Sequence, residues 1–235
     1  MKKIRIPFWM QIAAILLAGI LASGAAFWIA QEYMSNRQTE ELEKHTVTFA
    51  YLDGTVIEIK EVTHGKGVFP PELTDEGVFR GWSNGFNAVV ADVEAHPVYH
   101  SITENNLFHF DSVYVQEGNE FTLDICVGGH VSVSSGELTL EYDAEVLEFL
   151  DSKDMVKCTV SESTKGELVI CFNSDTVIKT ETLLSQLRFR AKEKDAYATE
   201  VILKASNIKV VAEGQELPAD CATINNKVFF IQEVG

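Results

Sequence analysis

Residues 136–149 read GELTLEYDAEVLEF, and their pattern is the clearest structural signal in the chain. Apolar and polar side chains alternate through the first half: the apolar set is Leu138, Leu140 and Tyr142, and the polar set is Glu137, Thr139 and Glu141. Successive side chains of a strand point to opposite faces, so the segment predicts a strand with one buried and one wet face. Asp143 then predicts a turn, because its carboxylate can accept hydrogen bonds from backbone amides two residues on.

Comparable strand signals recur through residues 108–232, separated by Gly, Asn and Asp. The apolar and β-branched runs lie at 112–115, 121–127, 138–142, 147–150, 156–160, 168–172, 183–190, 201–205 and 228–231. Nine short strands with turns between them fit two packed antiparallel sheets. We therefore expect a nine-stranded jelly-roll β-sandwich over residues 108–235.

This module resembles the cohesin family, the dockerin-binding domains of cellulosome scaffolds. The resemblance rests mainly on residues 136–149, with support from 116–118 (QEG), 166–172 (GELVICF) and 183–192 (LLSQLRFRAK). It implies a module that binds a dockerin-like or other protein partner in a surface assembly.

A smaller module precedes the sandwich at residues 46–101. Asp53-Gly54 separates two alternating runs and predicts a β-hairpin whose two turn positions both need positive φ. Pro70-Pro71 ends strand pairing, because proline cannot donate a backbone hydrogen bond. Trp82 is the expected anchor of this small core. Residues 102–107 then form a linker to the sandwich.

The smaller module resembles a single internalin-type B repeat, also called the Listeria–Bacteroides repeat. The matching elements are Val47-Thr48-Phe49, Asp53-Gly54-Thr55, Val62 with Gly65, Pro70-Pro71, Phe79 with Gly81-Trp82, and Val98-Tyr99. The family consists of β-grasp-like modules of bacterial surface proteins, usually in tandem. The resemblance implies a surface spacer or adhesion module.

The N-terminal segment, residues 1–30, has the features of a signal anchor. Residues 8–30 are mostly apolar and uncharged, and a helix of that length is about 34 Å long, enough to span a bilayer. Lys2, Lys3 and Arg5 precede the run, so the positive-inside rule leaves the N-terminus in the cytoplasm and exports the rest. The expected location is therefore the cell membrane, as a single-pass protein with an extracellular C-terminal part.

A cleaved signal peptide is the competing interpretation of this segment. Small-residue sites at Ala22-Ser23-Gly24 and Gly24-Ala25-Ala26 fit a signal peptidase, although the apolar run continues to Ile29. Both interpretations export the remainder. Residues 31–45 are polar and form either a helical stalk or a solvated linker.

Composition narrows the function classes. The chain carries 35 Asp and Glu against 19 Lys and Arg, a net charge of −16, which argues against nucleic-acid binding because phosphate contacts need clustered basic residues. Nucleophile-elbow, zinc-protease, phosphate-loop and EF-hand motifs do not occur in the sequence. We therefore predict a non-catalytic protein without a cofactor.

Histidines and cysteines give weak signals for a site. His96 and His100 are the closest histidine pair, but a strand would place them about 13 Å apart, too far to share a metal ion. Cys158 and Cys171 flank a turn whose Gly166 favours a bulged loop, which moves the two thiols out of direct opposition. Disulfides and buried free thiols both remain open.

The predicted partner-binding site is one flat sheet face. By resemblance to cohesins, the strands at 138–142 and 168–172 contribute to it. The candidate residues are Glu137, Thr139, Glu141, Glu167 and Asn173. An acidic strand beside an apolar one suits a partner helix with Lys or Arg around a small hydrophobic stripe. The alternative function is a carbohydrate-binding module in a polysaccharide-utilisation or adhesion system.

Overall fold

The computed structural model describes residues 43–74, 77–100, 106–128, 132–179, 182–193, 196–212, 214–219 and 222–231. These residues form strands joined by turns, and none of them is helical, which confirms a mostly β protein. No helix long and apolar enough to cross a membrane occurs among them, and the predicted span at 8–30 lies outside the described residues. Residues 44–235 group into one compact unit.

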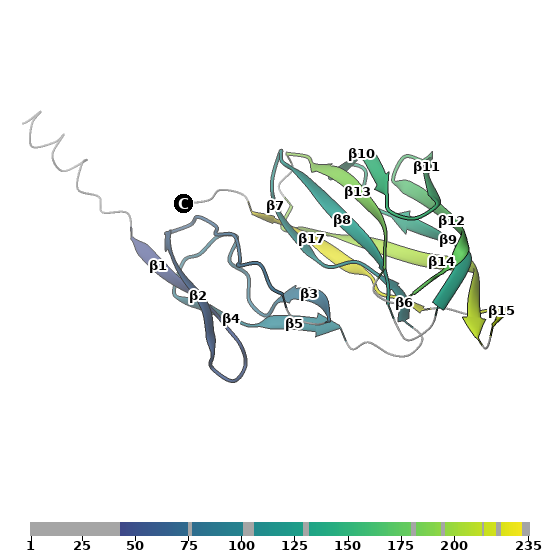
Figure 1. Cartoon of the computed structure of the whole chain (residues 1–235). Helices are drawn as coiled ribbons and strands as arrows, with labels where there is room; N and C mark the ends of the chain where they lie inside the picture. The colour runs from purple at the N-terminus through teal and green to yellow at the C-terminus, as the bar shows by residue number, and fades with distance from the viewer. Residues whose placement is uncertain are drawn as a thin grey trace, which may run out of the picture. The chain divides into compact units, whose positions relative to one another are not determined.

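The larger part of this unit is a sandwich of two sheets (Figure 1). Its strands are β6 (Asn106–His109), β7 (Val113–Gln116), β8 (Glu120–Val127), β9 (Ser132–Glu141), β10 (Leu147–Asp154), β11 (Cys158–Thr164), β12 (Glu167–Ile178), β13 (Leu183–Ala191), β14 (Ala198–Ala212), β15 (Gln215–Pro218), β16 (Ala222–Thr223) and β17 (Asn226–Ile231). One sheet has the order β10-β13-β8-β6-β16. The other has the order β11-β12-β9-β14-β17-β7, with β15 paired to β14.

The sandwich differs from the expected nine-stranded antiparallel one. All nine predicted segments form strands, but β6, β15 and β16 are additional. Two pairs are parallel, β17 with β7 and β16 with β6. The predicted count was therefore too low, and the sheets are mixed.

The core lies between the two sheets and follows the predicted alternation. On β9, Leu138 and Leu140 are fully buried, and Tyr142 just beyond the strand is buried as well. They pack in one cluster with inward residues of the opposite sheet, among them Leu187 and Phe189. The predicted Asp143 turn is confirmed, because its Oδ1 accepts a hydrogen bond from the Glu145 amide at 2.8 Å.

The smaller part consists of β1 (Lys44–Ala50), β2 (Val56–Thr63), β3 (Val78–Trp82), β4 (Val93–Ala95) and β5 (Pro97–His100). β1 pairs antiparallel with β2 and parallel with β4, and β3 pairs with β5. β1 begins inside the predicted stalk at Lys44. Trp82 is buried as expected and packs edge-on against Phe49, with ring centroids 4.7 Å apart.

The β1–β2 hairpin confirms the Asp53-Gly54 signal but not its turn type. Gly54 has a φ of 87°, whereas Asp53 does not have a positive φ. The Asp53 carboxylate instead accepts a hydrogen bond from the Thr55 amide at 2.9 Å, and Tyr51 and Thr55 close a longer loop through a 2.9 Å backbone bond. The prediction of a two-residue turn with both φ values positive was therefore wrong.

Direct contacts join the two parts. The Tyr114 ring on β7 stacks on Phe86 with centroids 5.3 Å apart, and its hydroxyl accepts a hydrogen bond from the Trp82 amide at 3.1 Å. Asn226 on β17 bonds to groups of both parts, and Ile231 at the end of β17 is buried in the smaller core.

Candidate partner-binding face

The four strands β11, β12, β9 and β14 lie side by side, and their outward side chains form one continuous surface. We call it the acidic sheet face. It consists of Thr159 and Ser161 on β11; Glu167, Val169, Cys171 and Asn173 on β12; Glu137, Thr139 and Glu141 on β9; and Ile202, Lys204 and Ser206 on β14.

The five residues predicted from the sequence all lie on this face. The antiparallel register of β9 and β12 places Glu141 opposite Glu167 and Glu137 opposite Cys171. Asn173 ends the regular part of the ladder, because the register shifts between Asn173 and Ile178. The structure therefore brings the candidate residues together; whether they bind a partner stays a prediction.

The apolar strand beside β9 turns only part of its hydrophobic surface outward. Leu168, Ile170 and Phe172 are buried in the core, so Val169 and Cys171 are the outward apolar side chains of the part of β12 that pairs with β9 in regular register. Ile202 adds a third on the far side of β9. Three outward apolar side chains thus lie among the carboxylates, two of them on β12 and one on the other side of β9.

The carboxylates of the face make polar contacts within it. Lys204 forms an ion pair with Glu141, and the Ser206 hydroxyl donates to Glu137 at 3.1 Å. The Glu167 carboxylate accepts a hydrogen bond from the hydroxyl of Ser163, near the end of β11. Three carboxylates face one ammonium group, so the face keeps a negative potential that attracts a cationic partner.

The outer face of the other sheet has a different charge balance. Arg188 and Arg190 on β13 pair with carboxylates on both neighbouring strands, namely Glu120, Glu148 and Asp151. Three acids thus surround two arginines, so this face also carries more acid than base, but its carboxylates are paired with guanidinium groups.

The two cysteines near the β11–β12 turn are not paired with each other. Cys158 lies opposite Phe172 and Cys171 opposite Thr159, which confirms the register slip expected from Gly166, whose φ is 93°. Neither cysteine forms a disulfide. Burial raises the pKa of the Cys158 thiol to about 12, with Asp154 adding to the shift. Burial and the nearby Glu137 carboxylate raise the pKa of Cys171.

The histidine pair considered from the sequence is split between two environments. His96 Nδ1 lies 2.9 Å from the carbonyl oxygen of Ala50, and His100 Nε2 lies 2.8 Å from Asn226 Oδ1. Sequence analysis missed a different pair, His45 and His64, which the β1–β2 hairpin brings together. The hairpin register was the signal that could have found it.

Comparisons with known proteins agree with the sandwich. A family model described as the cohesin domain matches residues 108–230. Among solved structures, the sixth cohesin of Acetivibrio cellulolyticus scaffoldin B, solved in complex with a Cel5 dockerin mutant, is 20% identical. The matched region covers 55% of this chain and 99% of the Acetivibrio cohesin, with a TM-score of 0.48.

Two further structures show a similar level of resemblance. The seventh ScaB type I cohesin of Pseudobacteroides cellulosolvens is 12% identical, covers 53% of this chain and 91% of that chain, and has a TM-score of 0.48. A non-cellulosomal cohesin from the archaeon Archaeoglobus fulgidus is 17% identical. The matched region covers 54% of this chain and 91% of the archaeal cohesin, with a TM-score of 0.44. A search of curated proteins gave no match.

Proposed function

The chain belongs to the cohesin family through residues 108–230, and we propose that this module captures a dockerin-like protein partner on the acidic sheet face. The family match is the observation that carries the proposal. The partner surface we infer is a helix with Lys or Arg around a small apolar stripe, because it would face Glu137, Glu141 and Glu167 around Val169 and Ile202.

The chemistry of the face supports a protein partner over a sugar. Carbohydrate platforms present aromatic rings for stacking against sugar rings, and none of the residues that make up the acidic sheet face is aromatic. The apolar side chains on it are aliphatic or thiol groups and lie among polar and charged ones, which suits a helix surface. The role of the module in this proposal is binding without catalysis.

A double charge reversal tests the proposed face. Replacing Glu137 and Glu141 with lysine turns the centre of the face basic, and we expect dockerin affinity to fall by more than about 100-fold through like-charge repulsion. The full chain is immobilised, and a panel of purified, calcium-loaded dockerin modules is measured by surface plasmon resonance. Circular dichroism and the thermal midpoint confirm that the variant is folded.

The matched control carries the same change of charge away from the face. On β2, Glu61 is exposed and Glu58 is half-buried, and they pair with Lys44 and Lys60. The E58K/E61K chain should bind as the parent does. If a folded E137K/E141K chain binds dockerin as tightly as the parent chain does, the acidic sheet face is not the binding site. Failure of every dockerin to bind the parent chain, while a solved cohesin binds its own dockerin in the same assay, would contradict dockerin capture.

We further propose that residues 8–30 anchor the chain in the cell membrane and that the single B-repeat-like module stands between the anchor and the sandwich at the bacterial surface. The length of the apolar run and the basic residues before it support this arrangement. The native protein should keep its N-terminus and fractionate with membranes, as checked by N-terminal peptide mass spectrometry. A mature protein that begins near Ala25 or Phe27 would instead identify a cleaved signal peptide.

A further inference from the structure

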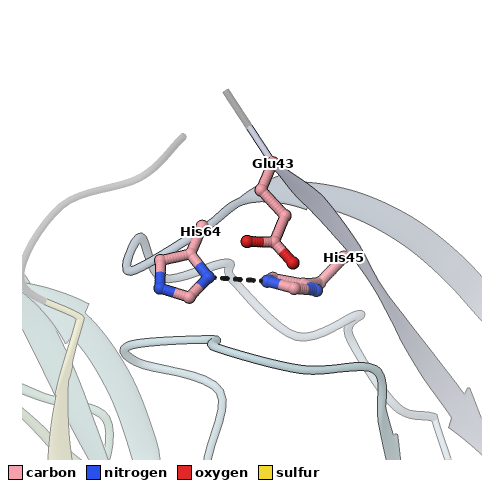
Figure 2. A group of neighbouring side chains, drawn as sticks. All are labelled: Glu43, His45 and His64. Carbon is pink, nitrogen blue, oxygen red and sulfur yellow. Dashed lines mark hydrogen bonds between the residues drawn. The ribbon is translucent and has the colours of Figure 1, made fainter. Parts of the chain in front are cut away.

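The smaller part of the chain holds a cluster of ligand-type side chains that dockerin binding does not use. His45 on β1 is only 8% exposed, and His64 directly follows β2. The Nε2 of His45 and the Nδ1 of His64 lie 2.8 Å apart. Figure 2 shows both rings with the Glu43 carboxylate beside them, and one ligand atom from each residue lies within 4.8 Å of the others.

The hairpin backbone places these groups. The antiparallel register pairs Lys44 with Thr63 and His45 with Val62, so the open end of the hairpin holds residue 43 on one strand and residue 64 on the other. Beyond β2 the chain is fixed by two backbone hydrogen bonds, from Lys66 to the Thr63 carbonyl at 2.9 Å and from Gly65 to the Val89 carbonyl at 2.7 Å. The imidazole of His64 is thus attached to a backbone held by hydrogen bonds on both sides.

We propose that Glu43, His45 and His64 bind one divalent transition-metal ion of the zinc type. Two imidazoles and one carboxylate are a ligand set that Zn²⁺ uses, with water in the fourth position, whereas Ca²⁺ and Mg²⁺ prefer oxygen ligands alone. The bound ion connects the start of β1 to the end of β2 and closes the open end of the hairpin.

The observed separation of the two ring nitrogens is close to what an ion needs. Tetrahedral coordination with Zn–N distances of roughly 2.0–2.1 Å places two ligand nitrogens about 3.3 Å apart. The rings of His45 and His64, now 2.8 Å apart at these atoms, have to separate by only about half an ångström. The ion replaces the hydrogen bond between them: the proton on one facing nitrogen moves to the other nitrogen of the same ring, so both rings stay neutral.

A specific metal site has to be distinguished from non-specific binding of cations to the acidic surface. With a net charge of −16, the chain attracts divalent cations weakly at many exposed carboxylates. A histidine site differs from this background in two ways: it saturates at one ion per chain, and it depends on His64. Co²⁺ in a tetrahedral site also gives strong visible d–d absorption, whereas octahedral Co²⁺ bound by surface carboxylates and water absorbs weakly.

The experiment uses the full chain, treated with a chelator and desalted. Isothermal titration calorimetry with Zn²⁺ measures stoichiometry and affinity, and absorption with Co²⁺ reports the ligand geometry. The variants are His64→Ala, which removes an exposed ring, and Glu43→Gln, which keeps the side-chain shape. Glu61→Gln is the matched control, since Glu61 is an exposed carboxylate of the same hairpin.

We expect one Zn²⁺ per parent chain and per E61Q chain. Affinity should fall by more than about tenfold in H64A and in E43Q, because even indirect changes to a metal site cost 10–100-fold. Zinc should raise the thermal midpoint of the parent chain but not that of H64A, whose metal-free midpoint serves as the folding control. Absence of saturable binding to the parent, or equal affinity in a folded H64A chain, would overturn the site.

Discussion

Replacing Phe189 with alanine should lower the free energy of unfolding by about 4 kcal/mol, because the substitution removes a fully buried ring from the core of the sandwich and leaves a cavity. Phe189 on β13 is 0% exposed. Its ring contacts Phe121, Tyr142 and Phe149, with centroid distances of 5.8, 5.1 and 5.5 Å. Phe121 and Phe149 come from the two strands that flank β13, and Tyr142 follows β9 of the opposite sheet, so no single shift can fill the space.

Chemical denaturation of the full chain, followed by circular dichroism, measures this loss. Phe121→Ala is the comparison, because Phe121 stacks on the same ring but is only partly buried, and its removal should cost clearly less. A loss below about 1.5 kcal/mol in F189A would show that the sandwich closes around the missing ring.

Much of the sandwich could be predicted because its strands carry strong local signals. The alternation at 137–142 fixed which side chains of β9 face the core, and the structure buries Leu138 and Leu140 as that pattern requires. Asp143 accepts a hydrogen bond from a nearby amide, and Gly166 adopts a positive φ. Both features depend on local geometry and on few distant contacts. Such features can be inferred from a short window of sequence.

The strands that were missed lack the local patterns that mark a strand. β16 has two residues and pairs in parallel with β6, more than 100 positions earlier in the chain. Two residues carry no periodicity, so the local sequence does not distinguish this strand from a loop. β15 extends the β14 hairpin around Gly214 and is exposed throughout, which removes the apolar pattern that marks other strands.

The candidate sites differ in the same way. Glu137, Thr139 and Glu141 could be placed on one surface from alternation alone, and the neighbouring strand was inferred from the cohesin resemblance. The cluster of His45 and His64 required the exact hairpin register, which depends on where the loop after β1 closes. The longer loop between Tyr51 and Thr55 was not predicted, so the register and the histidine pair were missed together.

Contacts between the two parts of the chain were the least predictable feature. One of them, made by Asn226, is expected to contribute strongly to the free energy of unfolding. Asn226 on β17 is 3% exposed, and its carboxamide donates to the carbonyls of Phe110 at 2.6 Å and Phe79 at 3.0 Å. Its Oδ1 accepts a hydrogen bond from His100 Nε2 at 2.8 Å. A single side chain thus satisfies groups of the smaller part and of the sandwich.

Replacing Asn226 with alanine should therefore lower the free energy of unfolding by about 3 kcal/mol, since buried carbonyls and the His100 ring lose their partner. Chemical denaturation measures the loss, and Asn173→Ala, at an exposed position, should stay within about 0.5 kcal/mol of the parent. In the double variant with His100→Ala, the two losses should fall short of additive by about 1 kcal/mol, because the shared hydrogen bond is removed only once. Full additivity, or a loss below about 1 kcal/mol in N226A, would mean that water replaces the carboxamide and that the two parts are joined mainly by the aromatic stack of Tyr114 on Phe86.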